Sequence, residues 1–254
     1  MTVGGAPADK AARLVALDEA LTVHGPPPRF VGRGGEKLDA ALEAFGLDVA
    51  GARALDAGAS TGGFTDALLQ RGAAEVVAVD VGHGQLDARL RGDDRVVVRE
   101  RTNVRHLADP GEVGGAVDLV TADLSFISLR TVLPALLAVA RPGADLVLLV
   151  KPQFEAGRQE VSRGKGVIAD PEVWRRVLAE VNGALVSHGA VIMGAMASPL
   201  TGADGNVEFL LWARAPGGAG TPAPAVDLEA VVDAVAGGSP RTAPAGADEP
   251  EAGR

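Results

Sequence analysis

The sequence predicts an α/β protein with a Rossmann-like sheet of seven strands and helices on both faces. Apolar runs of strand length alternate with amphipathic runs of helix length, in the order of βαβ units. The first strand candidate ends in a glycine-rich turn that opens directly into a helix. The 254 residues, 47% of them hydrophobic, suit one α/β domain with short extensions.

The strand and helix candidates follow one another between residues 36 and 213. The strand candidates are Ala52–Ala57, Glu75–Asp80, Val96–Arg99, Asp118–Asp123, Asp145–Val150, Ala190–Met196 and Val207–Ala213. The helix candidates are Glu36–Phe45, Gly63–Arg71, Gln85–Leu90, Leu129–Ala140 and Pro171–Ser187. The last two strands, joined by the loop SPLTGADGN, predict a hairpin whose final strand runs antiparallel.

The two ends of the chain differ from this central part. Residues 1–31 mix Gly, Pro and charged residues, and predict a peripheral arm with one loose helix over Ala11–Leu21. Residues 215–254 are rich in Ala, Gly and Pro, and predict a largely disordered acidic tail with a short helix over Asp227–Ala236. The α/β domain itself is expected over residues 32–214.

The composition excludes several kinds of chemistry. The chain has no Cys, and its four His show no metal-ligand spacing, so we expect no disulfide, no thiolate chemistry and no metal. No apolar stretch approaches the roughly 18 residues of a membrane span, so we expect no membrane partner and a cytoplasmic location. A net charge of -9 argues against broad electrostatic attraction to nucleic acid.

The segment LDAGASTGGFTDALLQRG carries the clearest ligand signal. A strand ends at Asp56, and a turn with Gly58, Gly62 and Gly63 opens into a helix. Glycines let a ligand approach the backbone, and a helix N-terminus offers free N–H groups. A tight turn without a ligand is the alternative, but so many glycines after a first strand favour a nucleotide-like cofactor.

Two further residues suit a cofactor with ribose and adenine. Asp80 ends the second strand, where a carboxylate can accept hydrogen bonds from both ribose hydroxyls, although it could instead cap a helix. Asn103 follows the third strand, where an adenine ring would lie, although a turn-forming Asn fits equally well. NAD-binding and methyl-donor-binding folds share these features. The turn AGASTGG, which departs from GxGxxG, and the seventh strand favour the methyl donor.

The reaction site is expected at the tips of the fourth and fifth strands. TADLSF and LLVKPQFE reach the same edge of a parallel sheet, so Asp123 and Lys151 should face one crevice. The chain has 20 Arg and only four Lys, and Arg does not release its proton in practice. Lys37 and Lys151 therefore favour a chemical role, such as easing the loss of a hydroxyl proton, over that of surface cations. For Lys37 alone, at the start of an amphipathic helix, a surface cation is an equal alternative.

Two carboxylates complete this group. Asp123 could orient Lys151 or accept hydrogen bonds from the amino group of the donor. Glu208 lies in NVEFLLW, inside a strand bordered by apolar residues, where a carboxylate usually has a partner. A salt bridge at the sheet edge would give the same pattern.

The motifs taken together resemble a known enzyme family. They are GRGGEKL, LDAGASTGGFT, VVAVDVGHGQL, ERTNVR, DLVTADLSFISL, LLVKPQFE, KGVIADP and SPLTGADGNVEFLLW. They are similar to the TlyA (hemolysin A) family of RNA 2′-O-ribose methyltransferases, which belongs to the FtsJ-like group. The resemblance implies an S-adenosylmethionine-dependent methyltransferase domain over residues 32–214, and ribosomal RNA or a ribosomal subunit as partner. The sequence offers no apolar segment for the pore formation that the hemolysin name implies.

The resemblance also implies the roles of individual residues. The FtsJ-like Lys-Asp-Lys-Glu tetrad maps onto Lys37, Asp123, Lys151 and Glu208, with Lys151 most directly engaged with the 2′-hydroxyl. The residues expected to bind S-adenosylmethionine are Asp56, Gly58, Ser60, Thr61, Gly62, Gly63, Phe64, Asp80, Asn103 and Asp123.

One departure from the family concerns RNA binding. Family members normally begin with a basic S4-like domain, whereas residues 1–40 of this chain carry five basic and five acidic side chains. Stacking residues are also few, because there is no Tyr and most of the Phe and Trp residues are expected in the core. For RNA we expect Arg33, Arg158 and Arg163 to contact phosphates.

Other functions stay open at this point. The acceptor could be a small hydroxylated metabolite, which suits the acidic charge. A non-catalytic RNA- or ribosome-binding paralogue is disfavoured by the intact tetrad, and an NAD-dependent oxidoreductase lacks a recognisable hydride site. The sequence does not predict the oligomeric state.

Overall fold

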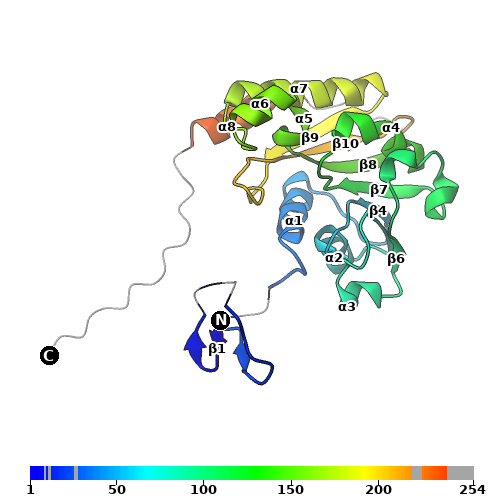
Figure 1. The fold of residues 1–254 in the computed structure, drawn as a ribbon. Helices are drawn as coiled ribbons and strands as arrows, with labels where there is room; N and C mark the ends of the chain where they lie inside the picture. The colour runs from blue at the N-terminus through cyan, green and yellow to red at the C-terminus, as the bar shows by residue number, and fades with distance from the viewer. Residues whose placement is uncertain (9, 11–12, 26–27, 219–224, 239–254) are drawn as a thin grey trace.

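The computed structural model describes residues 1–8, 10, 13–25, 28–218 and 225–238 (Figure 1). The side chains of Arg158, Gln159 and Arg163 lie outside this description. Among the described helices, none combines the length and the apolar character needed to cross a membrane.

The central sheet has the seven predicted strands. They are β4 (Arg53–Ala57), β5 (Glu75–Val79), β6 (Val96–Arg99), β7 (Val117–Ala122), β8 (Ala140–Val150), β9 (Val191–Ala197) and β10 (Phe209–Arg214). Their order is β6-β5-β4-β7-β8-β10-β9, and β10 runs antiparallel to both of its neighbours. The predicted fold class and the antiparallel final strand are confirmed. The order reverses between β4 and β7, and in such sheets this switch point is where ligands bind.

Eight helices are described along the chain. They are α1 (Gly34–Phe45), α2 (Gly63–Gln70), α3 (Ala88–Arg91), α4 (Leu129–Val139), α5 (Pro152–Glu155), α6 (Arg158–Arg163), α7 (Pro171–Ser187) and α8 (Leu228–Ala236). Two 3₁₀ turns, η1 (Val104–His106) and η2 (Pro110–Val113), lie between β6 and β7. The helix predicted over Gln85–Leu90 begins later, at Ala88, because the Asp87 side chain accepts the Arg89 N–H and caps the helix there. The short helices α5 and α6 were not predicted.

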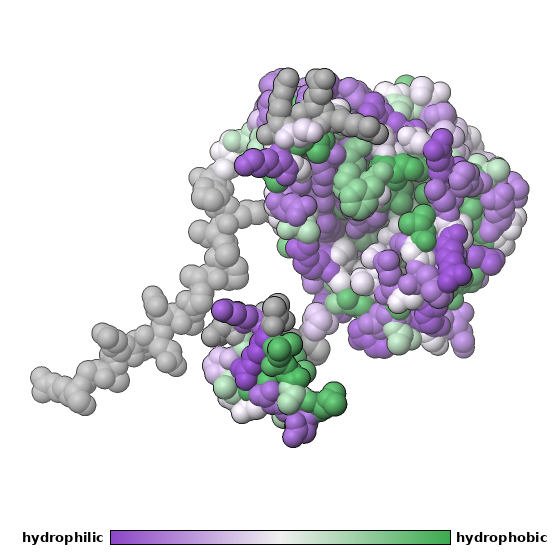
Figure 2. Space-filling model, viewed as in Figure 1, coloured by the Kyte–Doolittle hydropathy of each residue, from purple (hydrophilic) through white to green (hydrophobic). Residues whose placement is uncertain are grey.

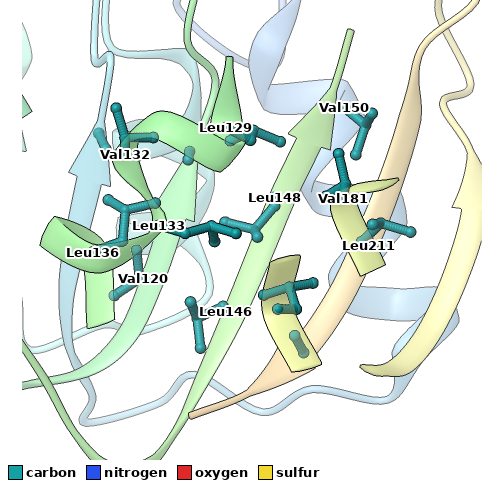
Figure 3. Packing of buried hydrophobic residues seen from close by; sticks show 14 of the residues in the cluster. Val120, Leu129, Val132, Leu133, Leu136, Leu146, Leu148, Val150, Val181 and Leu211 are labelled. Carbon is teal, nitrogen blue, oxygen red and sulfur yellow. The ribbon is translucent and has the colours of Figure 1, made fainter. Parts of the chain in front are cut away.

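The sheet is buried on both faces, which explains the continuous apolar run of β8. Leu146, Leu148 and Val150 point into a core that also contains α4 and α7 (Figure 3). Val147 and Leu149 point into the opposite core, with residues of α1 and α2. Strand residues alternate between faces, so a strand covered by helices on both sides needs apolar residues at every position.

The N-terminal residues form a small sheet in place of the predicted helix. β1 (Thr2–Val3) pairs antiparallel with β2 (Ala6–Pro7) and with β3 (Leu21–Thr22). The helix predicted over Ala11–Leu21 is wrong: residues 13–20 contain no helix, Leu21 lies in a strand, and residues 11 and 12 lie outside the described part.

The amphipathic pattern of this segment finds no core to face. Leu14 and Leu17 are fully exposed, and Figure 2 shows hydrophobic surface on this small sheet. A helix this short is marginal in water unless an apolar face packs against something. The apolar spacing of residues 11–21 alone is therefore insufficient to stabilise a helix.

The short helix expected in the C-terminal tail is confirmed as α8. Asp227 caps it by accepting the Ala230 N–H, and Val232 is buried in the core that contains α7. Arg175 of α7 pairs with Glu229 and Asp233 of α8. Residues 219–224 and 239–254, predicted as disordered, lie outside the described residues. The predicted domain limits at residues 32 and 214 stay predictions.

Candidate active site

Two adjoining cavities lie at the carboxyl ends of β4 and β7. The tetrad cavity, about 480 Å³, is lined by all four residues of the predicted tetrad. The Asp80 cavity, about 440 Å³, is lined by Asp80, Thr102 and Asn103. The two cavities share Gly58, Ser60, Asp123, Ser125 and Phe126. Both volumes are in the usual range for sites that bind small molecules.

Gly58 and Gly63 allow three segments to meet at the site. A Cβ on Gly58 would lie 2.5 Å from the Asp123 carbonyl oxygen, and φ is +87° there, a backbone angle that favours glycine. A Cβ on Gly63 would lie 2.9 Å from the Gly35 nitrogen. The turn after β4 therefore packs directly on the tip of β7 and on the start of α1, which carries Lys37.

Asp80 ties two loops together at the edge of the second cavity. Its Oδ2 accepts the Ser60 N–H at 2.8 Å, and its Oδ1 accepts the Gly82 N–H at 2.6 Å. A carboxylate oxygen can accept more than one hydrogen bond, so both oxygens can still accept from a ligand. Asn103 caps η1 by accepting the Arg105 N–H, as its turn-forming alternative predicted, and it also lines the cavity.

Asp56 lies beneath the glycine-rich turn and lines neither cavity. The residue is fully buried, and its Oδ2 accepts the Thr65 hydroxyl at 2.7 Å. Its Oδ1 has no hydrogen-bond partner among the described residues. Burial raises the pKa of the Asp56 carboxyl to about 7; the nearby Asp123 and Asp80 also raise it, whereas the Thr65 hydrogen bond lowers it. The structure therefore does not support direct contact between Asp56 and a donor.

Most of the other residues predicted for the donor do reach the cavities. Gly58, Ser60, Thr61, Gly63, Phe64 and Asp123 line the tetrad cavity. Gly62 does not line either cavity, because its Cα faces Leu86 and Leu90. Phe64 is 3% exposed, so it forms part of the cavity wall.

The first pair of the tetrad is buried. Lys37 of α1 forms an ion pair with Glu208, which immediately precedes β10. The side chains are 8% and 3% exposed. A buried carboxylate needs a partner, and here the partner is a lysine 171 residues away in the sequence.

The second pair of the tetrad joins the tips of β7 and β8. Lys151 Nζ lies 2.6 Å from Asp123 Oδ1 and donates to Ser125 Oγ at 3.1 Å. The expectation that Asp123 and Lys151 face one crevice is met. Ser125 was not among the residues predicted from the sequence.

A buried carboxylate, Glu155, holds these two tips together. Its Oε1 accepts the Leu129 N–H at the start of α4, and its Oε2 accepts the Ser128 hydroxyl. A carboxylate at a helix N-terminus is also favoured by the helix dipole. The single turn α5, which follows Lys151, is thereby fixed to the loop that follows Asp123.

Two aromatic rings contact each other across the same two loops. The rings of Phe126 and Phe154 are 5.1 Å apart, and Phe126 is 92% exposed. The backbone φ of Phe126 is +64°, which is uncommon for a residue other than glycine. Phe126 is therefore an exception to the expectation that most Phe and Trp residues lie in the core, as Phe30, Phe64 and Phe209 do.

The chain belongs to the FtsJ-like methyltransferase family, whose model matches residues 30–215. It is therefore a methyltransferase. It is similar to 16S/23S rRNA (cytidine-2′-O)-methyltransferase TlyA of Mycobacterium tuberculosis, with 56% identity over 84% of this chain and 79% of that protein. It is also similar to Hemolysin A of Brachyspira hyodysenteriae, with 40% identity over 72% of this chain and 75% of that protein.

Solved structures agree with the fold. A Lactococcus lactis protein, provisionally named a hemolysin, has a TM-score of 0.76 and 41% identity over 82% of this chain and 99% of its own. An S-adenosylmethionine-dependent methyltransferase from Mesorhizobium loti has a TM-score of 0.52 and 20% identity, over 69% of this chain and 96% of its own. The second likeness concerns the fold alone.

Breaking the buried pair is expected to destabilise the protein more than removing it whole. Glu208→Leu leaves Lys37 buried without its partner, and Lys37→Met does the same to Glu208. We expect each variant to lower the free energy of unfolding by about 3–5 kcal/mol, and the double variant to recover most of that loss. Urea denaturation of the four proteins measures these values. Losses that simply add in the double variant would contradict a coupled pair.

The raised pKa of Asp56 makes the stability of the protein depend on pH. Its pKa is raised from 3.8 in the unfolded chain to about 7, so the folded state keeps a proton that the unfolded state loses between these values. This contribution is fully present below about pH 4 and is lost as the pH rises through 7. Between pH 5 and pH 8 we expect wild type to lose roughly 2 kcal/mol more unfolding free energy than Asp56→Asn. Equal pH dependence of the two proteins in denaturant titrations would refute the assignment.

Proposed function

We propose that this chain transfers a methyl group from S-adenosylmethionine to a 2′-hydroxyl of ribosomal RNA. The observation that carries the proposal is the pair of lysine–carboxylate contacts, Lys37–Glu208 and Lys151–Asp123, in one cavity. That cavity adjoins a second one whose residues suit the donor. Membership of the FtsJ-like family and the similarity to TlyA of Mycobacterium tuberculosis support the same acceptor.

The Asp80 cavity fits the nucleoside part of S-adenosylmethionine. Asp80 would accept hydrogen bonds from the ribose hydroxyls, Asn103 lies beside the space for the adenine ring, and Gly58 leaves room for the donor at the backbone. When bound, the donor supplies an electrophilic methyl group on a positively charged sulfur. The residues shared by the two cavities would surround that methyl group, and Asp123 is the carboxylate among them.

The tetrad would then act on the acceptor. Lys37, held by Glu208, contributes a fixed positive charge that orients the ribose, and Lys151 lies where it can take the hydroxyl proton. The bound donor would supply its methyl group to the acceptor oxygen and would keep the electron pair of the broken carbon–sulfur bond on its sulfur. Lys151 would accept the hydroxyl proton in its neutral amine form, and the resulting ammonium would later return that proton to water.

Unpaired arginines near the site suggest how an acidic protein can bind RNA. Among the described residues, Arg33, Arg99, Arg101 and Arg105 have no carboxylate within 4.0 Å, whereas most of the other arginines form ion pairs. Arg33 lines the tetrad cavity, and Arg99 to Arg105 lie at the end of β6 and just beyond it. Phosphates can replace missing carboxylates, so these side chains favour a polyanionic acceptor. The predicted phosphate contacts of Arg158 and Arg163 fall on side chains outside the described set.

The exposed aromatic pair favours an acceptor that carries a base. Phe126 lies at the border of both cavities, and its ring is in contact with Phe154. Proteins that bind unpaired nucleotides commonly stack their bases on such exposed rings. Binding of a small hydroxylated metabolite would not require this exposed aromatic surface. A non-catalytic paralogue would not require the two lysine–carboxylate pairs.

Label transfer from tritiated S-adenosylmethionine tests the proposal. The purified protein is incubated with ribosomal subunits, with naked ribosomal RNA, or with the small molecules of a cell extract. We expect label in RNA that falls at least about 100-fold in Lys151→Ala, the usual size of a lost general base. Arg141→Ala, an exposed cation at the opposite edge of the sheet, is the matched control and should keep wild-type transfer. Label in small molecules alone would replace RNA by a metabolite acceptor.

A further inference from the structure

We infer that Ser125 is a positioning residue: its hydroxyl fixes the rotation of the Lys151 amino group so that the free position of its nitrogen is directed at the acceptor. The inference rests on the proposed function, because it concerns how Lys151 receives the acceptor proton. Ser125 belongs to neither the predicted tetrad nor the predicted donor-binding residues.

The contacts of Lys151 Nζ carry the inference. The nitrogen lies 2.6 Å from Asp123 Oδ1 and donates to Ser125 Oγ at 3.1 Å. An ammonium group has three N–H donors, so these two contacts leave one. Within the described part of the chain, no acceptor is paired with the third donor, and the Phe154 ring lies 5.8 Å from the nitrogen. Lys151 lines the tetrad cavity, and its side chain is only 11% exposed, so the third position is left for the acceptor.

Two fixed contacts are needed to direct the third. When the ammonium loses its proton, the amine keeps two N–H groups and gains one lone pair. A single contact to Asp123 would let the amino group rotate about its carbon–nitrogen bond. A second acceptor prevents this rotation, and the lone pair then takes the remaining tetrahedral position. A serine hydroxyl suits this task because it accepts a hydrogen bond from either form of lysine.

The local structure leaves Ser125 without another evident task. The N-cap of α4 is Ser128, whose side chain accepts the Arg130 N–H, so Ser125 is not needed to begin that helix. Ser125 lines both cavities, at the place where donor and acceptor would meet. The uncommon backbone conformation of Phe126 follows it directly, and such conformations persist where surrounding contacts hold them. Glu155 holds this loop through its hydrogen bonds to Ser128 and to the Leu129 N–H.

Other charged groups near Lys151 also influence its protonation, so the test must leave their charges unchanged. Those that line the tetrad cavity are Arg33, Lys37, Asp123, Asp204 and Glu208. Replacing Ser125 changes none of these charges. It removes one acceptor that favours the charged form of Lys151, so its loss should make Lys151 easier to deprotonate.

The first measurement follows single-turnover methyl transfer to ribosomal RNA across pH 6 to 9 at saturating donor. Lys151 acts as a neutral amine at high pH, so we expect Ser125→Ala to lower the high-pH rate about tenfold, the upper size of one lost hydrogen bond between neutral groups. We also expect the rising limb of the pH–rate profile to move to lower pH. Ser125→Thr keeps the hydroxyl and should restore both features. The donor dissociation constant of each variant is measured by calorimetry, so that all rates are compared at saturating donor and a change in donor binding does not enter them. The inference would be overturned if Ser125→Ala left the high-pH rate unchanged. It would also be overturned if the rate fell while the rising limb of the pH–rate profile stayed in place.

The second measurement is independent of RNA and of catalysis. The chain has only four lysines, so the signal of Lys151 in protein labelled with ¹³C at lysine Cε can be assigned with Lys151→Arg. We expect the midpoint of its titration to fall in Ser125→Ala and to return in Ser125→Thr. An unchanged midpoint contradicts the role of Ser125 even if wild type methylates RNA. A shifted midpoint in a protein that labels no RNA would support the role of Ser125 and contradict the proposed acceptor.

Discussion

The parallel pairing of β7 with β8 places Asp123 and Lys151 at one edge of the sheet, and the arrangement of the site depends on it. Ala122 of β7 is opposite Leu148 of β8, so the two strands end within a few residues of each other. Asp123 and Lys151 are the first residues beyond the two strands. Parallel strands are evenly paired and both end at the same edge, so residues distant in sequence are brought to ion-pair distance.

Three contacts between the two loops differ widely in exposure, from the exposed Phe126 ring to the buried Glu155 carboxylate. The Lys151–Asp123 pair faces the cavity, the Phe126 and Phe154 rings border it, and Glu155 is buried against the start of α4. The buried contact is charge-assisted and geometrically demanding, so it fixes the loops most strongly. Glu155 does not line the tetrad cavity, so it fixes the loops that carry Lys151 and Asp123 from outside that cavity.

The sheet also explains why the tetrad draws on both ends of the domain. α1 lies on the face of β4 and of its neighbours, next to α2, because Gly63 lets the two helices approach closely. β10 is inserted between β8 and β9, so Glu208 reaches the same edge from the other side of β8. Lys37 and Glu208 therefore become neighbours only when the sheet has formed from β4 to β10. Because both side chains are buried, either charge would be strongly unfavourable without the other.

The sequence was sufficient to predict the strands, most helices and the meeting of Asp123 with Lys151, whereas Lys37 and Glu208 were joined to that pair by the family resemblance. Apolar runs bounded by Gly and Asp mark the strands, and residues just after parallel strands share one edge. The position of Asp56 at the end of a strand did not predict the direction of its side chain. A carboxylate there can point toward the ligand or pack beneath the loop, as Asp56 does. Ser125 and Phe126 could not be predicted either. Phe126 has an uncommon backbone conformation, and both residues contact the loop that begins at Lys151. Neither feature produces a periodic pattern in the segment DLSF.

The chemical position of the transferred methyl group distinguishes 2′-O-methylation from methylation of a base. Ribosomal RNA that has received labelled methyl groups from this protein is digested to nucleosides and resolved by mass spectrometry. We expect the label in 2′-O-methylated nucleosides, because we propose that Lys151 accepts the proton of a ribose hydroxyl. Label on the nucleobases would contradict it.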